Sequence, residues 1–166
     1  IIAGFETTMH MLTLGMLELA ERPALQAYLL AGPAETVKMV DELLRYIGMA
    51  KGMLRVARTD FEWHGQQIRE GDFVFGMNIS ANRDTRVWVD PDTIDPERNN
   101  AKSVAFGPGM HFCLGHLLAR MELGEFFTEL FGNYEIAILS DERSWINSFT
   151  FRGLDRLPVR ITRRTA

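Results

Sequence analysis

The first third of the chain has the hydrophobic spacing of amphipathic helices. Apolar residues recur at intervals of three and four, which predicts a helix from Ile1 to about Glu21. The residues of this stripe are Met9, Leu12, Met16 and Leu19. A second, short helix is predicted from Pro23 to Leu30, ended by Gly32-Pro33. A third is predicted over Thr36–Tyr46, with an apolar stripe of Val37, Val40, Leu43 and Leu44.

After Gly48 the pattern changes to short runs that suit strands. Three are predicted: Leu54–Ala57, Phe61–Trp63 and Phe73–Phe75. Turn signals separate them, at His64-Gly65 and at Glu70-Gly71-Asp72. Residues 78–102 have no long periodic run, and a loop of this length is uncommon unless it has a role.

A last helix is predicted from about Leu114 to Phe131, closed by Gly132. Two weak strands are expected in the tail, at Tyr134–Leu139 and Leu157–Thr162. The pattern as a whole therefore predicts a mainly α protein with a small β region.

Composition narrows the class of protein. The 166 residues are 46% hydrophobic and 24% charged, as in a globular domain with a core. The net charge of −4 gives no reason to expect nucleic acid as a partner. No run approaches the roughly 20 apolar residues that cross a bilayer, so no membrane is expected. One cysteine cannot form an internal disulfide, which favours a reducing cytoplasm.

The N-terminus lies inside an apolar helical pattern and has no initiator methionine. It also lacks the basic start and small-residue end of a secretory signal. We therefore expect the chain to be part of a longer protein, with the upstream part missing.

Cys113 stands between a glycine-rich loop and a predicted helix start. Unpaired backbone N–H groups and the positive end of the helix dipole would stabilise a thiolate there. A lone cysteine is more commonly a small buried hydrophobe. A zinc site with His111 and His116 is a weaker alternative, because zinc sites generally take four ligands in separated pairs. The residues alone leave these readings open.

The loop as a whole resembles one family. Phe106 to Gly115 matches every fixed position of the haem-binding signature of the cytochrome P450 family, Phe-x-x-Gly-x-x-x-Cys-x-Gly, with a basic residue two before the cysteine. The resemblance implies that Cys113 is the axial thiolate of a haem b iron. Phe106 would pack beside this ligand and His111 would bind a propionate. Gly107 and Gly115 would let the backbone approach the flat group.

The run Ala3–Thr8 is similar to the family's oxygen-activation segment, Ala/Gly-Gly-x-Asp/Glu-Thr. Taken alone, it reads as a helix with a few polar residues, in which threonine can bond back to a carbonyl. The resemblance implies that Glu6 and Thr7 are the catalytic acid–alcohol pair, delivering protons to O₂ held in a groove at Gly4.

Two further constellations gain meaning from the resemblance. Glu42 and Arg45 lie three apart on a helix, where such pairs usually sit on the surface. In the family they form a buried structural network, which Arg98 would complete. Arg55 would bind a haem propionate, although an exposed strand arginine is the alternative.

The resemblance covers residues 1–166, as the C-terminal part of one cytochrome P450 domain of the soluble bacterial type. It implies a monooxygenase that inserts one atom of O₂ into a small hydrophobic substrate, with electrons from a ferredoxin and its reductase. A departure at Met49-Ala50, where the family often has Pro-Val, affects the expected substrate pocket. The alternatives are a peroxide-using or non-oxygenating relative and a truncated remnant without turnover.

Overall fold

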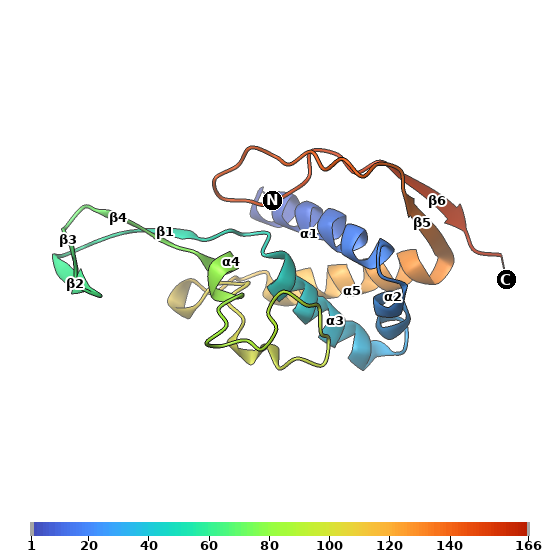
Figure 1. Cartoon of the computed structure of the whole chain (residues 1–166), viewed down its shortest axis with the longest axis horizontal. Helices are drawn as coiled ribbons and strands as arrows, with labels where there is room; N and C mark the ends of the chain where they lie inside the picture. The colour runs from blue at the N-terminus through green and yellow to red at the C-terminus, as the bar shows by residue number, and fades with distance from the viewer. Residues whose placement is uncertain (1, 166) are drawn as a thin grey trace.

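A body of helices forms the centre of the molecule, with β hairpins at its two ends (Figure 1). This computed structural model describes residues 2–165. The main helices are α1 (Ile2–Ala20), α2 (Pro23–Leu29), α3 (Pro33–Ile47) and α5 (His116–Asn133). The mainly α prediction with a small β region is confirmed. In the part of the chain described, no helix combines the length and the apolar character that crossing a membrane requires.

Helices α1 and α5 run in the same direction, side by side. The Thr8 hydroxyl lies 3.5 Å from a Glu122 carboxylate oxygen near their first turns, and Gly15 meets Phe127 further along. The first turn of α1 therefore lies at the same end of the helix pair as the start of α5. Side chains from four helices fill the core beneath them, among them Leu14, Leu19, Leu29, Met39, Leu43, Ile47, Leu123, Phe127 and Phe131.

The predicted stripe of α3 is only partly correct. Val40, Leu43 and Leu44 are buried, but Val37 is 58% exposed. Met39 and Ile47 take part in the buried face instead. The core therefore contacts a face of α3 that is rotated away from Val37.

Within residues 2–165, six strands form three antiparallel pairs. The pairs are β1 (Met53–Val56) with β4 (Phe73–Gly76), β2 (Phe61–Trp63) with β3 (Gln66–Ile68), and β5 (Tyr134–Ile138) with β6 (Val159–Arg163). Strand β3 was not predicted, because its glutamines give no hydrophobic signal. Its turn was identified: His64 and Gly65 both have positive φ, as a two-residue hairpin loop of type I′ requires.

Several predicted boundaries are wrong. Pro33 begins α3 rather than ending α2, since proline suits the first helical position, where its missing N–H has no partner to lose. Helix α5 starts at His116, two residues later than predicted, and continues through Gly132. The predicted loop of residues 78–102 contains a short helix, α4 (Asn78–Ala81), and a 3₁₀ turn, η1 (Asn100–Lys102).

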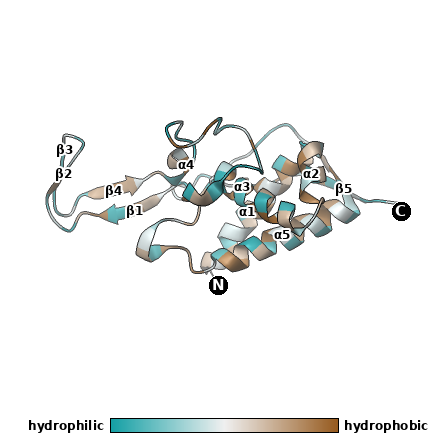
Figure 2. Cartoon of the chain, turned by 90° about the horizontal axis from the view of Figure 1, so that it is seen from below, coloured by the Kyte–Doolittle hydropathy of each residue, from teal (hydrophilic) through white to brown (hydrophobic). Residues whose placement is uncertain are grey.

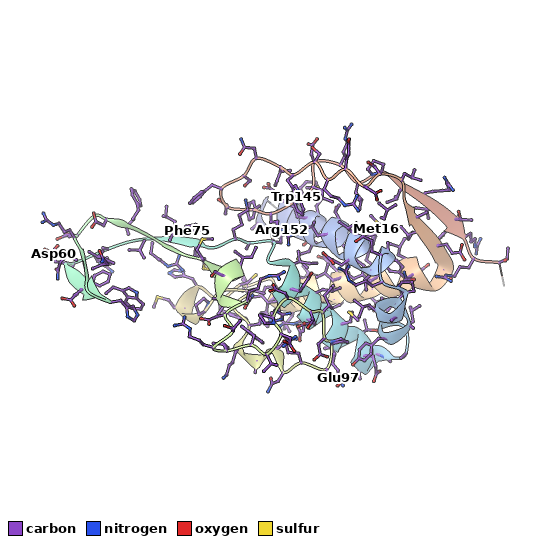
Figure 3. All side chains as sticks on the ribbon, in the orientation of Figure 1. Met16, Asp60, Phe75, Glu97, Trp145 and Arg152 are labelled. Atoms are coloured by element: carbon purple, nitrogen blue, oxygen red, sulfur yellow. The ribbon has the colours of Figure 1, made fainter. Side chains whose placement is uncertain are left out.

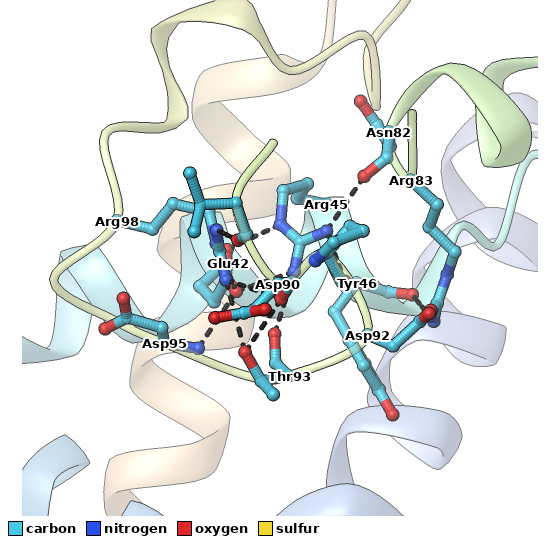
Figure 4. A network of polar contacts seen from close by, with 12 residues as sticks. Glu42, Arg45, Tyr46, Asn82, Arg83, Asp90, Asp92, Thr93, Asp95 and Arg98 are labelled. Carbon is cyan, nitrogen blue, oxygen red and sulfur yellow. Dashed lines mark hydrogen bonds and ion pairs between the residues drawn. The ribbon is translucent and has the colours of Figure 1, made fainter. Parts of the chain in front are cut away.

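A buried ion-pair network joins α3 to this loop (Figure 4). The side chains of Glu42 and Arg45 are both 0% exposed. Arg45 donates to both carboxylate oxygens of Glu42, at 2.8 and 2.7 Å, and Arg98 Nε adds a third contact at 3.2 Å. The three residues predicted from separate parts of the sequence thus meet in one network.

The Arg45 side chain also binds the backbone of the loop. Its guanidinium donates to the carbonyls of Asn82, Pro91 and Thr93 at 2.8, 2.9 and 3.0 Å. These carbonyls belong to a segment that lacks a hydrogen-bonding ladder of its own. The buried arginine therefore takes the place of secondary structure in holding residues 82–93.

The charge of Glu42 is maintained despite its burial. Burial alone would raise the pKa of Glu42, but hydrogen bonds from Arg45, the Asp95 amide and Arg98 outweigh it and hold this pKa below its ordinary value. The carboxylate therefore stabilises the folded state in its ionised form.

Replacing Glu42 with Gln leaves two arginines buried without their counter-charge. We expect the free energy of unfolding to fall by about 3–5 kcal/mol, measured by urea unfolding followed by circular dichroism. Glu97→Gln makes the same chemical change in an exposed pair with Lys38, 2.8 Å apart, and should cost far less because water already solvates both groups. Equal losses in the two variants would contradict a dominant role for the buried network.

The stability difference between the unmodified chain and Glu42→Gln is expected to depend on pH. A glutamate with a lowered pKa in the folded state stabilises the fold above its ordinary pKa of 4.5, and this contribution is lost as pH falls through the folded-state value. The stability difference between the unmodified chain and Glu42→Gln should therefore be constant at neutral pH and narrow below about pH 4.

Gly15 allows the close approach of α1 and α5. A Cβ at this position would lie 2.3 Å from Cζ of Phe127, whose ring is fully buried and cannot move aside freely. We expect Gly15→Ala to cost about 1–3 kcal/mol of stability through overpacking. In the control Gly4→Ala, on the same helix, the new Cβ meets no atom within 4 Å, so the change should be neutral or stabilising by up to about 1 kcal/mol. Thermal unfolding distinguishes the two, and a stabilised Gly15→Ala would overturn this account of the packing.

Candidate functional site

The segment from Phe106 to Cys113 is a closed backbone loop. The Cys113 amide donates to the Phe106 carbonyl at 3.0 Å, and inside this closure lies the 3₁₀ turn η2 (Gly109–His111). Gly107 and Gly109 have φ of +73° and +75°, a region in which other residues are strained. These glycines let the chain double back, and the Cys113 side chain is left partly exposed.

Arg120 and His116, both on α5, fix the loop to the helices. The Arg120 guanidinium lies 4.6 Å from the centre of the Phe106 ring, and its Nε donates to Asp41 of α3 at 2.6 Å. His116 contacts the Phe112 ring edge-on, with ring centres 4.8 Å apart, and lies 3.0 Å from Arg120. The supporting role of Arg120 was not predicted, and His116 was considered only as a ligand of the alternative zinc site. The only sequence signal is that His116 and Arg120 are four apart on one helix.

A second route connects the loop to the buried network. The Asn82 carbonyl accepts from Arg45, while its side-chain oxygen accepts from the Val104 amide at 2.9 Å. The Val104 carbonyl then accepts from the Gly107 amide at 2.9 Å. The cysteine loop is therefore held through three successive hydrogen bonds to a side chain with no exposure.

Cys113 lies just before α5 rather than at its first turn. Gly115 is the N-cap, and the His116 amide donates to the Cys113 carbonyl at a long 3.4 Å. The helix dipole was expected to act on this sulfur directly. The late start of α5 leaves Cys113 two residues before the cap, on the loop side of the helix end.

Large apolar side chains around Cys113 face solvent. Leu114 is 99% exposed and Met110 is 94% exposed. Further exposed members lie on the same loop and along α5: Phe112, Leu117, Leu118 and Met121. In Figure 2 the ribbon of α5 alternates between brown, hydrophobic and teal, hydrophilic segments. So large an apolar surface on one short stretch of chain indicates contact with something else.

Strand β1 brings a positive charge to the edge of the loop. A Cβ at Gly107 would lie 2.1 Å from Cε of Met53, so strand and loop are in close contact. Arg55, on the same strand, is exposed and lies 3.5 Å from the Met53 sulfur. Within the described residues, neither Arg55 nor His111 has a carboxylate at ion-pair distance. Two basic side chains are thus available to an anionic ligand.

The predicted acid and alcohol lie on the first turns of α1. The Thr7 hydroxyl donates to the Ala3 carbonyl at 2.6 Å, and Glu6 is partly exposed. A Cβ on Gly4 would meet no atom within 4 Å, so the helix surface there is open. Because α1 and α5 run parallel, this open surface lies at the end of the helix pair nearest Cys113 (Figure 1).

One polar residue beside this pair was not predicted. His10 follows Glu6 by one turn and is buried, with its Nε2 3.8 Å from a Glu6 carboxylate oxygen. In the sequence it stands between Met9 and Met11, within an apolar stretch, and nothing there separates it from a core residue.

These residues fit a haem group. They combine one thiol, an apolar surface, two basic side chains for carboxylates, and backbone at Gly109 and Gly115 that opens onto free space. Among residues 2–165, no three His, Cys, Asp or Glu side chains lie close enough together to hold a metal ion. A protein ligand set for zinc is therefore lacking around Cys113, whereas a haem iron needs only the one sulfur from this side.

Comparison with known proteins gives one consistent family. The family model described as Cytochrome P450 matches residues 36–161. Pentalenic acid synthase of Streptomyces avermitilis is 40% identical over 163 residues, which cover 96% of this chain and 40% of that protein. This chain therefore spans about two fifths of the length of that curated relative.

Solved structures agree with the sequence matches. The polyketide synthase cytochrome P450 PksS of Bacillus subtilis superimposes with a TM-score of 0.87 at 36% identity, over 95% of this chain and 42% of that one. P450 OxyD, which is involved in the biosynthesis of vancomycin-type antibiotics, gives a TM-score of 0.90 at 36% identity, over 98% and 42%.

Proposed function

Because the chain belongs to the cytochrome P450 family, we propose that residues 1–166 are the C-terminal part of a single haem-thiolate monooxygenase domain. The observation that carries the proposal is a partly exposed thiol on a braced loop, within an apolar surface and beside two basic side chains, Arg55 and His111, that have no carboxylate partner among residues 2–165. The proposed reaction inserts one oxygen atom of O₂ into a small hydrophobic substrate. Haem b, when bound, supplies the redox chemistry, while the protein supplies ligand, orientation and protons.

The proximal residues have distinct roles in this proposal. The Cys113 sulfur would bind the haem iron, and Phe106 would pack beside this sulfur. His111 and Arg55 bind the two propionates, for which charge-assisted hydrogen bonds are favourable. Gly115 leaves the backbone free of side chains where the flat group would approach, and Gly107 takes the positive φ that turns the loop there.

On the other side, Glu6 and Thr7 hold and move protons. The Thr7 hydroxyl donates a hydrogen bond to the Ala3 carbonyl, so its oxygen remains free to accept a second hydrogen bond. Glu6 is half exposed and can exchange protons with water. The presence of both groups supports activation of O₂ rather than a peroxide-using or non-oxygenating reaction.

Two segments far apart in sequence are proposed to line the substrate side. The Lys51 amide donates to the Thr150 carbonyl at 2.9 Å, and the rings of Phe75 and Phe149 have centres 4.6 Å apart. Figure 3 shows Phe75 on β4, on the part of the β1–β4 strand pair that is nearer to the helices. The aromatic pair supports a hydrophobic substrate.

We further propose a ferredoxin, with its reductase, as the electron donor. Its docking surface would be a groove behind the cysteine loop, lined among others by Phe106, Phe112 and Arg120. Phe106 and Phe112 belong to the loop that carries the sulfur, and Arg120 contacts it. An electron that arrives at this groove therefore has a short path to the Cys113 sulfur.

The first test is the spectrum of the full-length haem-loaded protein, reduced and bound to carbon monoxide. We expect the thiolate-type Soret band, and its complete loss in Cys113→Ala, because residues 1–166 hold no other cysteine and the loop presents this sulfur. His111→Ala is the control: it should weaken haem retention but keep a thiolate-type band. A histidine-type band in the fresh, unmodified protein would disprove the ligand assignment.

The second test concerns proton delivery. In Thr7→Val and in Glu6→Gln, we expect turnover with a ferredoxin and its reductase to fall by at least about a hundredfold, the lower end of general acid–base effects. Thr8→Val is the matched control, because the Thr8 hydroxyl points to Glu122 instead. Equal losses in Thr7→Val and Thr8→Val would mean that the hydroxyl is needed only for packing.

A further inference from the structure

His10 is the one buried histidine beside the proposed acid. It is 4% exposed, and Phe151 lies against it with ring centres 6.4 Å apart. Gly153 closes the other side: a Cβ there would lie 2.2 Å from His10 Nδ1. The imidazole is therefore enclosed between α1 and the segment 151–154. This segment passes over the helix, and its Arg152 lies beside Trp145 (Figure 3).

The tight fit argues against a simple core-filling role. An apolar side chain would fill this space without a glycine opposite it, and a buried imidazole that lacks partners costs free energy. Gly153 is fully buried and leaves room for the ring alone. The surrounding segment is thus shaped around an imidazole.

Glu6 is the acidic partner within reach of this ring. His10 Nε2 lies 3.8 Å from Glu6 Oε1, inside ion-pair range but too far for a hydrogen bond. The other charged groups of the covering segment are directed elsewhere. Arg152 donates to the Ile47 carbonyl at 2.7 Å and lies over the Trp145 ring, and Asp155 is exposed.

The two partners differ in freedom. The ring of His10 is 5% exposed and enclosed, whereas the side chain of Glu6 is 45% exposed. Any adjustment that closes the remaining gap must therefore come from the carboxylate. His10 is a fixed point to which a mobile acid can return.

We propose that His10 is a positioning residue for Glu6, holding the acid on the face of α1 from which it supplies protons to bound O₂. The inference rests on the proposed monooxygenase function. Its consequence is chemical: with two electrons and two protons O₂ leaves as H₂O₂, and with four of each it leaves as two H₂O. A misplaced Glu6 slows the later protons and raises the share of peroxide.

The experiment uses the full-length haem-loaded enzyme, without substrate, supplied with electrons by a ferredoxin and its reductase. The readout is the amount of H₂O₂ formed per O₂ consumed. His10→Leu keeps an apolar filling but removes the nitrogen, and we expect its peroxide share to rise at least twofold. His10→Gln puts a side-chain amide near the place of Nε2 and should restore at least half of the difference.

The opposite side of the ring offers an independent variant. Gly153→Ala leaves His10 in the chain but forces its ring away from its present position, so its peroxide share should rise in the same direction. If His10→Leu does not fold, Gly153→Ala decides the question. A peroxide share unchanged in the folded variants, or equal rises in His10→Leu and His10→Gln, would overturn the positioning role.

Failure of the inference can be told from failure of the proposed function. If the thiolate-type band is absent from the unmodified enzyme, or Glu6→Gln leaves the peroxide share unchanged, the proposed function itself fails. If Glu6→Gln raises the share and His10→Leu does not, only the inference fails. When His10 acts through Glu6, adding His10→Leu to Glu6→Gln produces no further rise, whereas additive rises contradict it.

Discussion

The buried pair of Glu42 and Arg45 is the interaction on which the rest of the structure depends. Its two charges have no contact with water, so each must be matched by the protein: the carboxylate by two arginines and an amide, the guanidinium by the carboxylate and three carbonyls. Those carbonyls come from a segment with little regular structure. The cost of burying the charges is thereby coupled to one conformation of this segment, since every other conformation leaves a buried donor unpaired.

That coupling extends to the cysteine loop. Asn82 lies between the two, with its carbonyl on Arg45 and its side chain on the Val104 amide. On the other side, Arg120 joins the Phe106 ring to Asp41 of α3, the residue next to Glu42. Helix α3 therefore supports the loop from two directions. The sulfur-bearing face can remain exposed and apolar because the loop's conformation is fixed from behind.

The sequence predicted most of the helices because their buried residues follow the helical period, as with Val40 and Leu43 on α3. It failed where the stabilising contact is not periodic. Strand β3 has one apolar residue, Ile68, after two glutamines, and it forms because the turn before it returns the chain. The ends of α3 and α5 were misplaced because Pro33 and Gly132 are compatible with more than one local structure. The motif located the cysteine loop, but its support by Arg120 and Asp41 involves residues 79 apart in sequence, a pairing that no local pattern reports.

The same limit explains why His10 escaped notice. A histidine four residues after a glutamate is common on exposed helices, where the pair contributes little. What distinguishes this one is Gly153, more than 140 residues away, whose missing side chain makes room for the ring. The close contact of Gly15 with Phe127 sets α1 against α5 and fixes which residues of α1 face the covering segment. The burial of His10 therefore depends on two glycines, Gly15 on its own helix and the distant Gly153. The acid beside it is the part of the proposed site whose chemistry depends most on tertiary packing.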